Sequence, residues 1–431
     1  MINAPVTIHS VLLQPGLGVV YDPLTAVYHP TETVSLGLVF DKLAPLWLEC
    51  PVAAGQTAVQ LADTMRQTVV PLLTGRTLDD FRALSAELDG LQETIVVERE
   101  LPLPAAVENP PAFVSRRGFL RGNDPVRPPR PEPVLEREVV KRPLSPPIRL
   151  TASLLLLEAF AAARRQPVAA FLMEAYGLAG GKTAVSILIN LPQTELAIAP
   201  TALQQHVAAI GTTSRSVEEL GKQGKELQKY ARQLVEWLKA YGDYVPALHL
   251  NTRGGIGKAF NNSSGLSFGL LFGIGMAAAP HIIRFEDPVW LDSQAAQLAE
   301  MSKLCDYARR RRTKVELIAQ AWVDSLADVH TFIEKKAAHM LHLSLTKLGS
   351  VDALLAAVAA CRAAGVGVLL SDGAWVWGEN GRFAHLLAHI ALAAQPDLVT
   401  LTATPAGDAG LSLLHNEMQR VLQMGHEVSR A

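Results

Sequence analysis

Residues 340–371 read MLHLSLTKLGSVDALLAAVAACRAAGVGVLLS, and this stretch sets the fold that we expect. An apolar run at 340–345 is followed by a helical pattern at 351–364 and by a second apolar run at 367–371. Strands that are buried on both faces have near-continuous apolar sequences, and a helix between two of them is typical of a parallel sheet. The stretch therefore predicts a strand–helix–strand unit.

The same alternation continues on both sides of this unit. Helical patterns lie at 216–240, 291–312, 351–364 and 380–394. We expect eight strands, at 184–189, 195–198, 247–252, 282–286, 315–320, 340–345, 367–371 and 398–403. Eight such units close into a parallel (β/α)8 barrel, in which chemistry lies at the carboxyl ends of the strands.

The N-terminal part has a different pattern. Residues 7–50 alternate short β-rich runs with turn signals, which predicts a small antiparallel sheet. Helices are expected at 58–73, at 78–91 with Thr77 as N-cap, and at 151–176 with a break at Pro167. The fold class is therefore α/β, with an N-terminal α+β lid domain over 1–165 and a barrel domain over 166–431.

A proline-rich insertion lies within the lid. Residues 102–147 hold 12 of the 27 prolines, too many for a continuous helix or a central strand. We expect an extended excursion here. A surface loop without a role and an arm that binds a partner both remain open, because a solvated proline-rich segment needs no function to exist.

Composition excludes several classes of protein. The 431 residues are 49% hydrophobic and 19% charged with a formal net charge of −2, so the chain must bury a large core and offers no basic surface for nucleic acid. Its cysteines, Cys50, Cys305 and Cys361, are odd in number and form no C-x-x-C pair, which suits a reducing compartment. The first 30 residues show no secretion signal, so we expect a cytoplasmic protein.

One segment could be interpreted as a membrane helix. Residues 259–283 include no charged side chain, and Gly265, Gly269 and Gly273 within them lie at four-residue spacing. Gly275 and Pro280 interrupt the run, and a strand-like segment follows directly. We therefore expect a buried or partner-facing helix and no membrane contact.

Several short segments, taken in order, resemble one enzyme family. They lie at 15–17, 249–251, 254–260, 284–288, 316–322, 339–349 and 410–422. In these segments the chain resembles methylaspartate ammonia-lyase, a member of the enolase superfamily. The resemblance implies a lid over a modified (β/α)8 barrel and elimination of ammonia from 3-methylaspartate. In that family Mg²⁺ binds the substrate carboxylate and a lysine removes the proton beside it.

The metal ligands of the family are only partly matched. Its three carboxylates correspond to Asn251, Glu286 and Gln320, so one acidic ligand of three remains. Mg²⁺ prefers hard anionic oxygens and gives up its water reluctantly. Any Mg²⁺ site in this chain is therefore expected to be weak.

The catalytic and substrate-binding positions also depart from the family. The lysine base corresponds to Ser344. The second base corresponds loosely to His206, which could equally be a solvated residue of a helix without a catalytic role. Substrate-contacting side chains correspond to Asn190 and His342. His342 and Ser344 could also form a base and a nucleophile, although residues two apart on a strand need not reach each other.

Two functions follow from these departures. The first is a non-catalytic or strongly impaired relative that acts as a structural or regulatory partner, in a homodimer or a heterodimer with an active paralogue. The second is a working lyase for 3-methylaspartate or a related amino acid, with Glu286, Asn251 and Gln320 as a weak metal cage and His206 as base. The first is favoured because two anionic ligands and the lysine are lost together.

Overall fold

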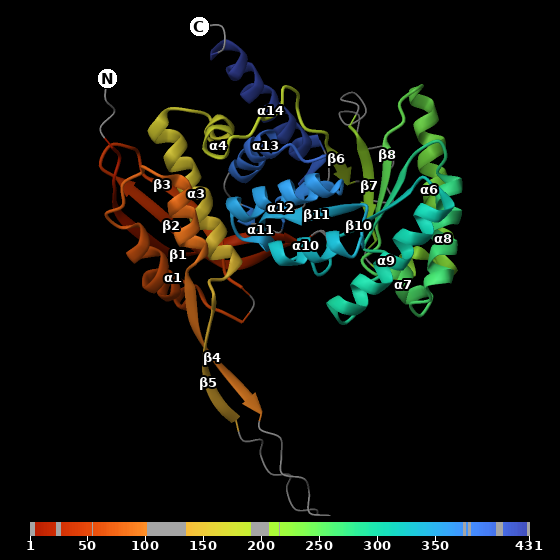
Figure 1. Ribbon diagram of the computed structural model, residues 1–431, viewed down its shortest axis with the longest axis horizontal. Helices are drawn as coiled ribbons and strands as arrows, with labels where there is room; N and C mark the ends of the chain where they lie inside the picture. The colour runs from red at the N-terminus through yellow and green to blue at the C-terminus, as the bar shows by residue number, and fades with distance from the viewer. Residues whose placement is uncertain are drawn as a thin grey trace, which may run out of the picture.

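The structure is a computed structural model that describes residues 5–22, 27–53, 55–100, 135–190, 207–214, 216–373, 376–377, 381–401 and 408–428. An antiparallel sheet with its helices lies beside a parallel barrel, and a two-stranded ribbon projects from the side of the sheet (Figure 1). This arrangement confirms the expected lid and barrel.

The lid sheet is built from β1 (Ile8–Asp22), β2 (Val27–Phe40) and β3 (Leu46–Pro51), which pair antiparallel as predicted. Val34, Leu36 and Leu38 alternate along β2 and are fully buried, so one face of the sheet covers the core. A fourth strand, β13 (Val376–Trp377), pairs with β1 and comes from the barrel half of the chain. Sequence gave no indication of this long-range pairing.

Helices α1 (Ala58–Leu73) and α3 (Pro146–Arg164) pack on the lid sheet. Helix α2 (Phe81–Asp89) packs on α1 and α3, and α4 (Val168–Tyr176) packs between α3 and the barrel half of the chain. The expected bounds of α1 are confirmed, but α2 begins after Asp80 and not after Thr77. Thr77 bridges to Thr7, and the N–H of Leu78 bonds to the carbonyl of Val6, so this segment is held against the sheet. The Asp80 carboxylate accepts the N–H of Ala83 and caps the helix instead.

The described part of the proline-rich segment is extended, in line with the expected excursion. Residues 101–134 lie outside the described part of the chain. Beyond them, β5 (Leu135–Pro143) pairs antiparallel with β4 (Gln92–Glu100), in the projecting ribbon of Figure 1. Helix α3 already begins at Pro146, because the first turn of a helix does not use the N–H that proline lacks.

Helix α3 is the one described helix that is long and apolar enough to cross a membrane. Of its most apolar window, 67% is buried, and the helix contributes Leu154, Leu155 and Phe160 to the main core. Burial of this extent is typical of a core helix.

The barrel consists of eight parallel strands, and the predicted barrel is confirmed. They are β6 (Leu188–Asn190), β7 (Ala209–Thr213), β8 (Ala247–Asn251), β9 (Ile283–Glu286), β10 (Val315–Ala319), β11 (Met340–Ser344), β12 (Gly367–Ser371) and β14 (Leu398–Thr400). Neighbouring strands pair in chain order, apart from β13, and a bridge between Ile187 and Val399 joins the two ends of the sheet.

The second strand of the barrel was placed wrongly. The structure forms β7 at 209–213, to which we assigned no element, and the predicted strand at 195–198 lies outside the described residues. Gly211 explains why the strand at 209–213 is hard to recognise from the sequence. A Cβ at this position would lie 2.9 Å from both Asn190 Oδ1 and the His249 carbonyl oxygen, so close contact with two neighbouring strands favours glycine in the strand.

Helices cover the outside of the barrel. They are α6 (Lys225–Leu238), α7 (Gly255–Ala259), α8 (Ser264–Ala277), α9 (Gln294–Arg311), α10 (Leu326–Glu334), α11 (Leu345–Leu348), α12 (Val351–Ala364), α13 (Arg382–Ala394) and α14 (Asp408–Val428). The continuous helix expected at 216–240 is broken by positive φ angles at Gln223 and Gly224, and α6 starts after them.

The interior of the barrel has an apolar layer below a polar one. Leu188, Ala209, Ile318, Met340, Leu369 and Leu398 form a separate apolar cluster inside the barrel. Towards the carboxyl ends, strand register places Asn251 beside Glu286 and Ser344 beside Ser371. The polar side chains at these ends form the candidate site.

Candidate functional site

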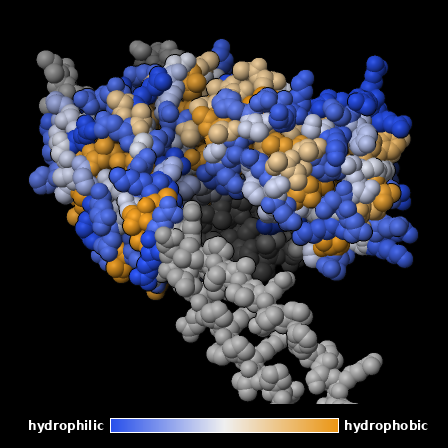
Figure 2. All heavy atoms as spheres, turned by 60° about the horizontal axis from the view of Figure 1, so that its bottom comes forward, coloured by the Kyte–Doolittle hydropathy of each residue, from blue (hydrophilic) through white to orange (hydrophobic). Residues whose placement is uncertain are grey.

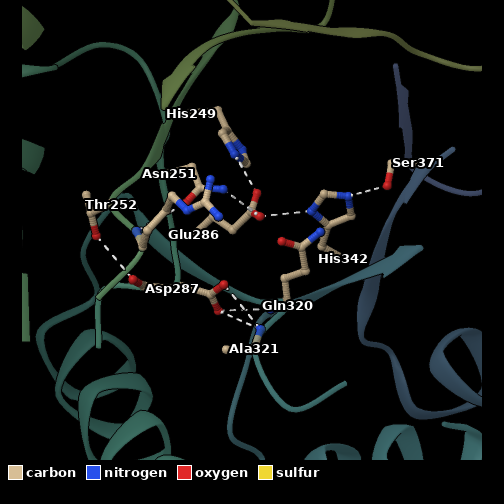
Figure 3. A network of polar contacts seen from close by, with 10 residues as sticks. His249, Asn251, Thr252, Glu286, Asp287, Gln320, Ala321, His342 and Ser371 are labelled. Carbon is tan, nitrogen blue, oxygen red and sulfur yellow. Dashed lines mark hydrogen bonds and ion pairs between the residues drawn. The ribbon is translucent and has the colours of Figure 1, made fainter. Parts of the chain in front are cut away.

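The candidate site lies at the carboxyl ends of β8, β9, β11 and β12 (Figure 3). Side chains alternate along a strand, so His249 and Asn251 share one face of β8. Glu286 ends β9, His342 lies on β11, and Ser371 ends β12. These five side chains meet because the strands are parallel and their ends gather at one mouth of the barrel.

Glu286 is the centre of the site. Its Oε2 accepts a hydrogen bond from His249 Nε2 at 2.8 Å, and its Oε1 accepts bonds from His342 Nδ1 at 2.9 Å and Asn251 Nδ2 at 2.8 Å. The residue is 1% exposed. Burial alone would raise the pKa of Glu286, but the charge of His342 and the hydrogen bonds from both histidines outweigh it, so the pKa lies far below its usual range.

The ionised carboxylate fixes the hydrogens on both imidazole rings. A carboxylate only accepts, so His342 carries hydrogen on Nδ1 and His249 on Nε2. In its neutral form His342 then accepts at Nε2, and the Ser371 hydroxyl lies 2.8 Å away in position to donate to it. His249 Nδ1 is buried and has no hydrogen-bond partner among the residues the structure describes.

The two amide side chains do not act alike. Asn251 donates to Glu286 through its nitrogen, and its oxygen accepts the backbone N–H of Arg253 at 3.1 Å, so both ends of the amide are used within the protein. The side chain of Gln320 reaches from the end of β10 towards His342 (Figure 3). The Gln320 backbone is held by Asp287 and by the amine of Lys347.

Asp287 follows Glu286 but turns away from it (Figure 3). Its carboxylate accepts the backbone N–H groups of Gln320 and Ala321, and its carbonyl oxygen accepts from the hydroxyl of Thr252. Burial, together with the charge of Glu286, raises the pKa of Asp287 to about 6 despite these bonds. Asp287 therefore ties three loops together and does not act as a second acid beside Glu286.

The remaining predicted site residues have separate environments. The hydroxyl of Ser344 lies 2.8 Å from that of Thr346 and does not contact His342, so the hydroxyl partner of His342 is Ser371. Asn190 ends β6, and its Oδ1 is buried without a partner among the described residues. His206 lies outside the described residues. The amine of Lys347 pairs with Asp324 at 2.8 Å.

Sequence reasoning missed two members of the network, His249 and Ser371. His249 could have been found because it lies two residues before Asn251, on the same strand face. Ser371 could have been found as the last residue of a strand whose neighbour carries Ser344. Which ring nitrogen faces which partner could not be read from sequence.

The donor set does not fit Mg²⁺. This ion requires near-octahedral coordination by oxygens, usually from one or two carboxylates together with water. Here the oxygens of Glu286 already accept three N–H groups, and the Asn251 oxygen accepts a fourth. Within the described ranges, no group of three His, Cys, Asp or Glu side chains is arranged to hold a metal ion.

Comparison with known proteins places the chain in a family. Residues 197–427, more than half of the chain, match the family described as methylaspartate ammonia-lyase C-terminus. The chain belongs to the methylaspartate ammonia-lyase family. Methylaspartate ammonia-lyase 2 of Carboxydothermus hydrogenoformans is 29% identical over 301 residues, which cover 68% of this chain and 71% of that protein.

Solved structures related to the methylaspartate ammonia-lyase family share the fold over nearly the whole chain. A Mg complex of β-methylaspartase from Clostridium tetanomorphum has a TM-score of 0.73 at 21% identity and covers 98% of this chain and 99% of its own. The Citrobacter amalonaticus enzyme containing (2S,3S)-3-methylaspartic acid has a TM-score of 0.75 at 19% identity, with coverage of 97% and 100%. At these identities the likeness establishes the enolase-like fold alone.

Proposed function

We propose that this chain is a member of the methylaspartate ammonia-lyase family that has lost Mg²⁺-assisted elimination of ammonia and acts as a structural or regulatory subunit. The observation that carries the proposal is the set of three hydrogen bonds received by Glu286 from His249, Asn251 and His342. These N–H donors stabilise the buried carboxylate in the way that a bound cation would.

A cation and these donors compete for the same oxygens. Binding Mg²⁺ at Glu286 would require His249, Asn251 and His342 to turn away, and each would leave a buried hydrogen-bonding group without its partner. Asn251 would also have to release the N–H of Arg253 to offer its oxygen. The site therefore favours the protein's own hydrogen bonds over a hard metal ion.

The position of the family's lysine base is also poorly suited here to remove a proton from carbon. Ser344, at the family's lysine position, has a hydroxyl bonded to Thr346, while the His342 ring is bonded to Glu286 and Ser371. The amine of Lys347, three residues after Ser344, is paired with Asp324 and bonded to the Gln320 carbonyl. An amine held as a charged ion-pair partner cannot accept a proton.

Helix α8 supports the subunit role. Leu266 and Met276 are 59% and 66% exposed, and a side chain at Gly265 or Gly269 would meet nothing within 4 Å. Figure 2 shows patches of hydrophobic residues among hydrophilic ones on the face it draws. We propose that α8 contacts a second copy of the chain, and a related active lyase is the alternative partner that the association experiment below would detect.

The experiment combines Mg²⁺ titration by calorimetry with an assay for mesaconate absorbance in the presence of 3-methylaspartate. The Clostridium tetanomorphum enzyme, measured in parallel, controls for the assay. We expect no Mg²⁺ binding at millimolar concentration and no turnover. Turnover by the unmodified protein that Glu286→Gln abolishes would contradict the proposal and favour a working lyase with a rebuilt site.

A paired substitution tests the physical cause. Asn251→Asp together with Gln320→Asp restores two carboxylates at the matched positions. If loss of anionic oxygens explains the missing site, this variant should bind Mg²⁺ at least about tenfold more tightly than the unmodified protein. Equal binding in the two proteins would show that the missing carboxylates are not the cause.

A further inference from the structure

Three residues of the network are joined by two successive hydrogen bonds, an arrangement that suits nucleophilic chemistry. Ser371 Oγ is 2.8 Å from His342 Nε2, and His342 Nδ1 is 2.9 Å from Glu286 Oε1. A serine nucleophile needs a base within about 2.6–3.2 Å, and the base needs a third group that orients it. Each residue comes from a different strand, β12, β11 and β9, so the barrel sheet itself holds the geometry.

The hydrogens are placed in the required direction. In the neutral form of His342, the carboxylate of Glu286 holds the hydrogen on Nδ1, which leaves Nε2 as the acceptor that faces the Ser371 hydroxyl. Two further bonds, from His249 and Asn251, keep the Glu286 carboxylate in position. The imidazole can therefore take the proton of Ser371, and the carboxylate stabilises the imidazolium that forms.

A pair of hydroxyls, those of Ser344 and Thr346, lies next to these three residues. Ser344 is the register partner of Ser371 on the neighbouring strand, and its hydroxyl lies 2.8 Å from that of Thr346. Gly373, two residues after Ser371, has a φ of +70° and passes so close that any side chain there would collide with both hydroxyls. Two hydroxyls joined by one hydrogen bond have a second hydrogen left to donate, which could stabilise an oxygen that gains negative charge.

We propose that Ser371, His342 and Glu286 form a nucleophilic triad that accepts an acyl group from a small activated ester. Ser371 Oγ forms a bond to the ester carbonyl carbon while its proton moves to His342 Nε2. The carbon–oxygen bond of the ester then breaks, and the alcohol leaves with the proton from His342. Water attacks the acyl-serine in the same way, which releases the acid and restores the serine.

Burial limits the acyl group that could react. Ser371 is fully buried, and His342 and Glu286 are 3% and 1% exposed. Any ester that reacts with such a serine must therefore carry a small acyl group, and the carboxylate of Glu286 disfavours a negatively charged one. The reaction needs neither metal nor amino acid, so this inference goes beyond the proposed function and stands or falls separately from it.

The test uses methanesulfonyl fluoride, a small reagent that sulfonylates activated serines with release of fluoride. The folded full-length protein is incubated with the reagent, and its intact mass and peptide map locate the label. We expect one methanesulfonyl group on Ser371. His342→Gln should slow the reaction at least about a hundredfold, the usual contribution of a general base. Ser371→Ala should abolish it.

Two further variants keep the test decisive. Thr400, the register partner of Ser371 on β14, is also buried, and Thr400→Val should label at the rate of the unmodified protein. If Ser371→Ala does not fold, Ser371→Cys should instead react with iodoacetamide faster than Cys50, Cys305 and Cys361. No label on the folded protein, a label on Ser344, or labelling that does not depend on His342 would each overturn the proposal.

Discussion

The carboxylate of Glu286 receives N–H groups from β8 and β11, although its own strand supplies none of them. A buried charge without partners would cost several kcal/mol, so these donors are needed for the fold as well as for the site. Asp287, the next residue along, satisfies its carboxylate with backbone N–H groups instead. The two adjacent acids thus have different roles, because their side chains point in opposite directions and meet different donors.

A half-buried histidine, His339, gives a testable pH dependence. Its Nδ1 accepts the backbone N–H of Leu317 at 3.0 Å. Burial, with the charge of Arg309, lowers the pKa of His339 below its ordinary value of 6.5. The unfolded chain therefore takes up a proton before the folded protein does. The stability that His339 contributes is complete above pH 6.5 and is lost as the pH falls through its folded pKa.

The measurement is urea unfolding at about pH 7.5 and about pH 5.5. The variant His339→Asn offers an amide oxygen to the Leu317 N–H but does not titrate. We expect the unfolding free energy to fall less in the variant than in the unmodified protein between the two pH values. An equal fall in both proteins would show that His339 does not contribute to acid sensitivity.

At the scale of elements, α8 differs from the other barrel helices. Ser267, Leu271 and Ile274 face the barrel, whereas Leu266 and Met276 are exposed beside the open surface at Gly269. An exposed apolar helix face of this kind is typical of a contact surface. The sequence predicted a buried or partner-facing helix, and the structure shows that one face is buried and the other open.

The double substitution Leu266→Lys and Met276→Lys tests association through α8. Two charges on an apolar contact face should weaken a dimer at least about tenfold, because each must be desolvated when the subunits meet. Light scattering across a range of concentrations measures the change. Val59→Lys, at a similarly exposed position on α1, should have no effect. A monomeric unmodified protein would contradict self-association and direct the search to a related lyase chain.

At the scale of the molecule, the lid and the barrel share one hydrophobic core. Phe81 and Phe160 meet Phe171 with ring centroids 5.4 and 5.9 Å away. The Ser350 hydroxyl at the start of α12 donates to Asp89 of the lid at 2.8 Å, and Tyr176 donates to Asp352 at 2.8 Å. Strand β13 adds a backbone connection to the lid sheet. We therefore expect the two parts to unfold together.

Phe160→Ala tests this coupling. Loss of a fully buried phenylalanine should lower the free energy of unfolding by about 3–5 kcal/mol. Calorimetry should show a single transition at a lower temperature, since the cavity lies in the core that both parts share. Leu17→Ala, at an exposed position of the lid sheet, should change stability by less than about 0.5 kcal/mol. Two separate transitions would contradict a common core.

The sequence by itself determined the barrel, the antiparallel lid sheet and most helix positions, because apolar periodicity reports burial and burial decides these elements. It also placed Asn251, Glu286 and Gln320 near strand ends. Only the tertiary structure decided that His249 and Ser371 join the site, that β7 forms around Gly211, and that β13 pairs with the lid. These features depend on side-chain direction and on close contact between segments far apart in the chain, which local patterns do not encode.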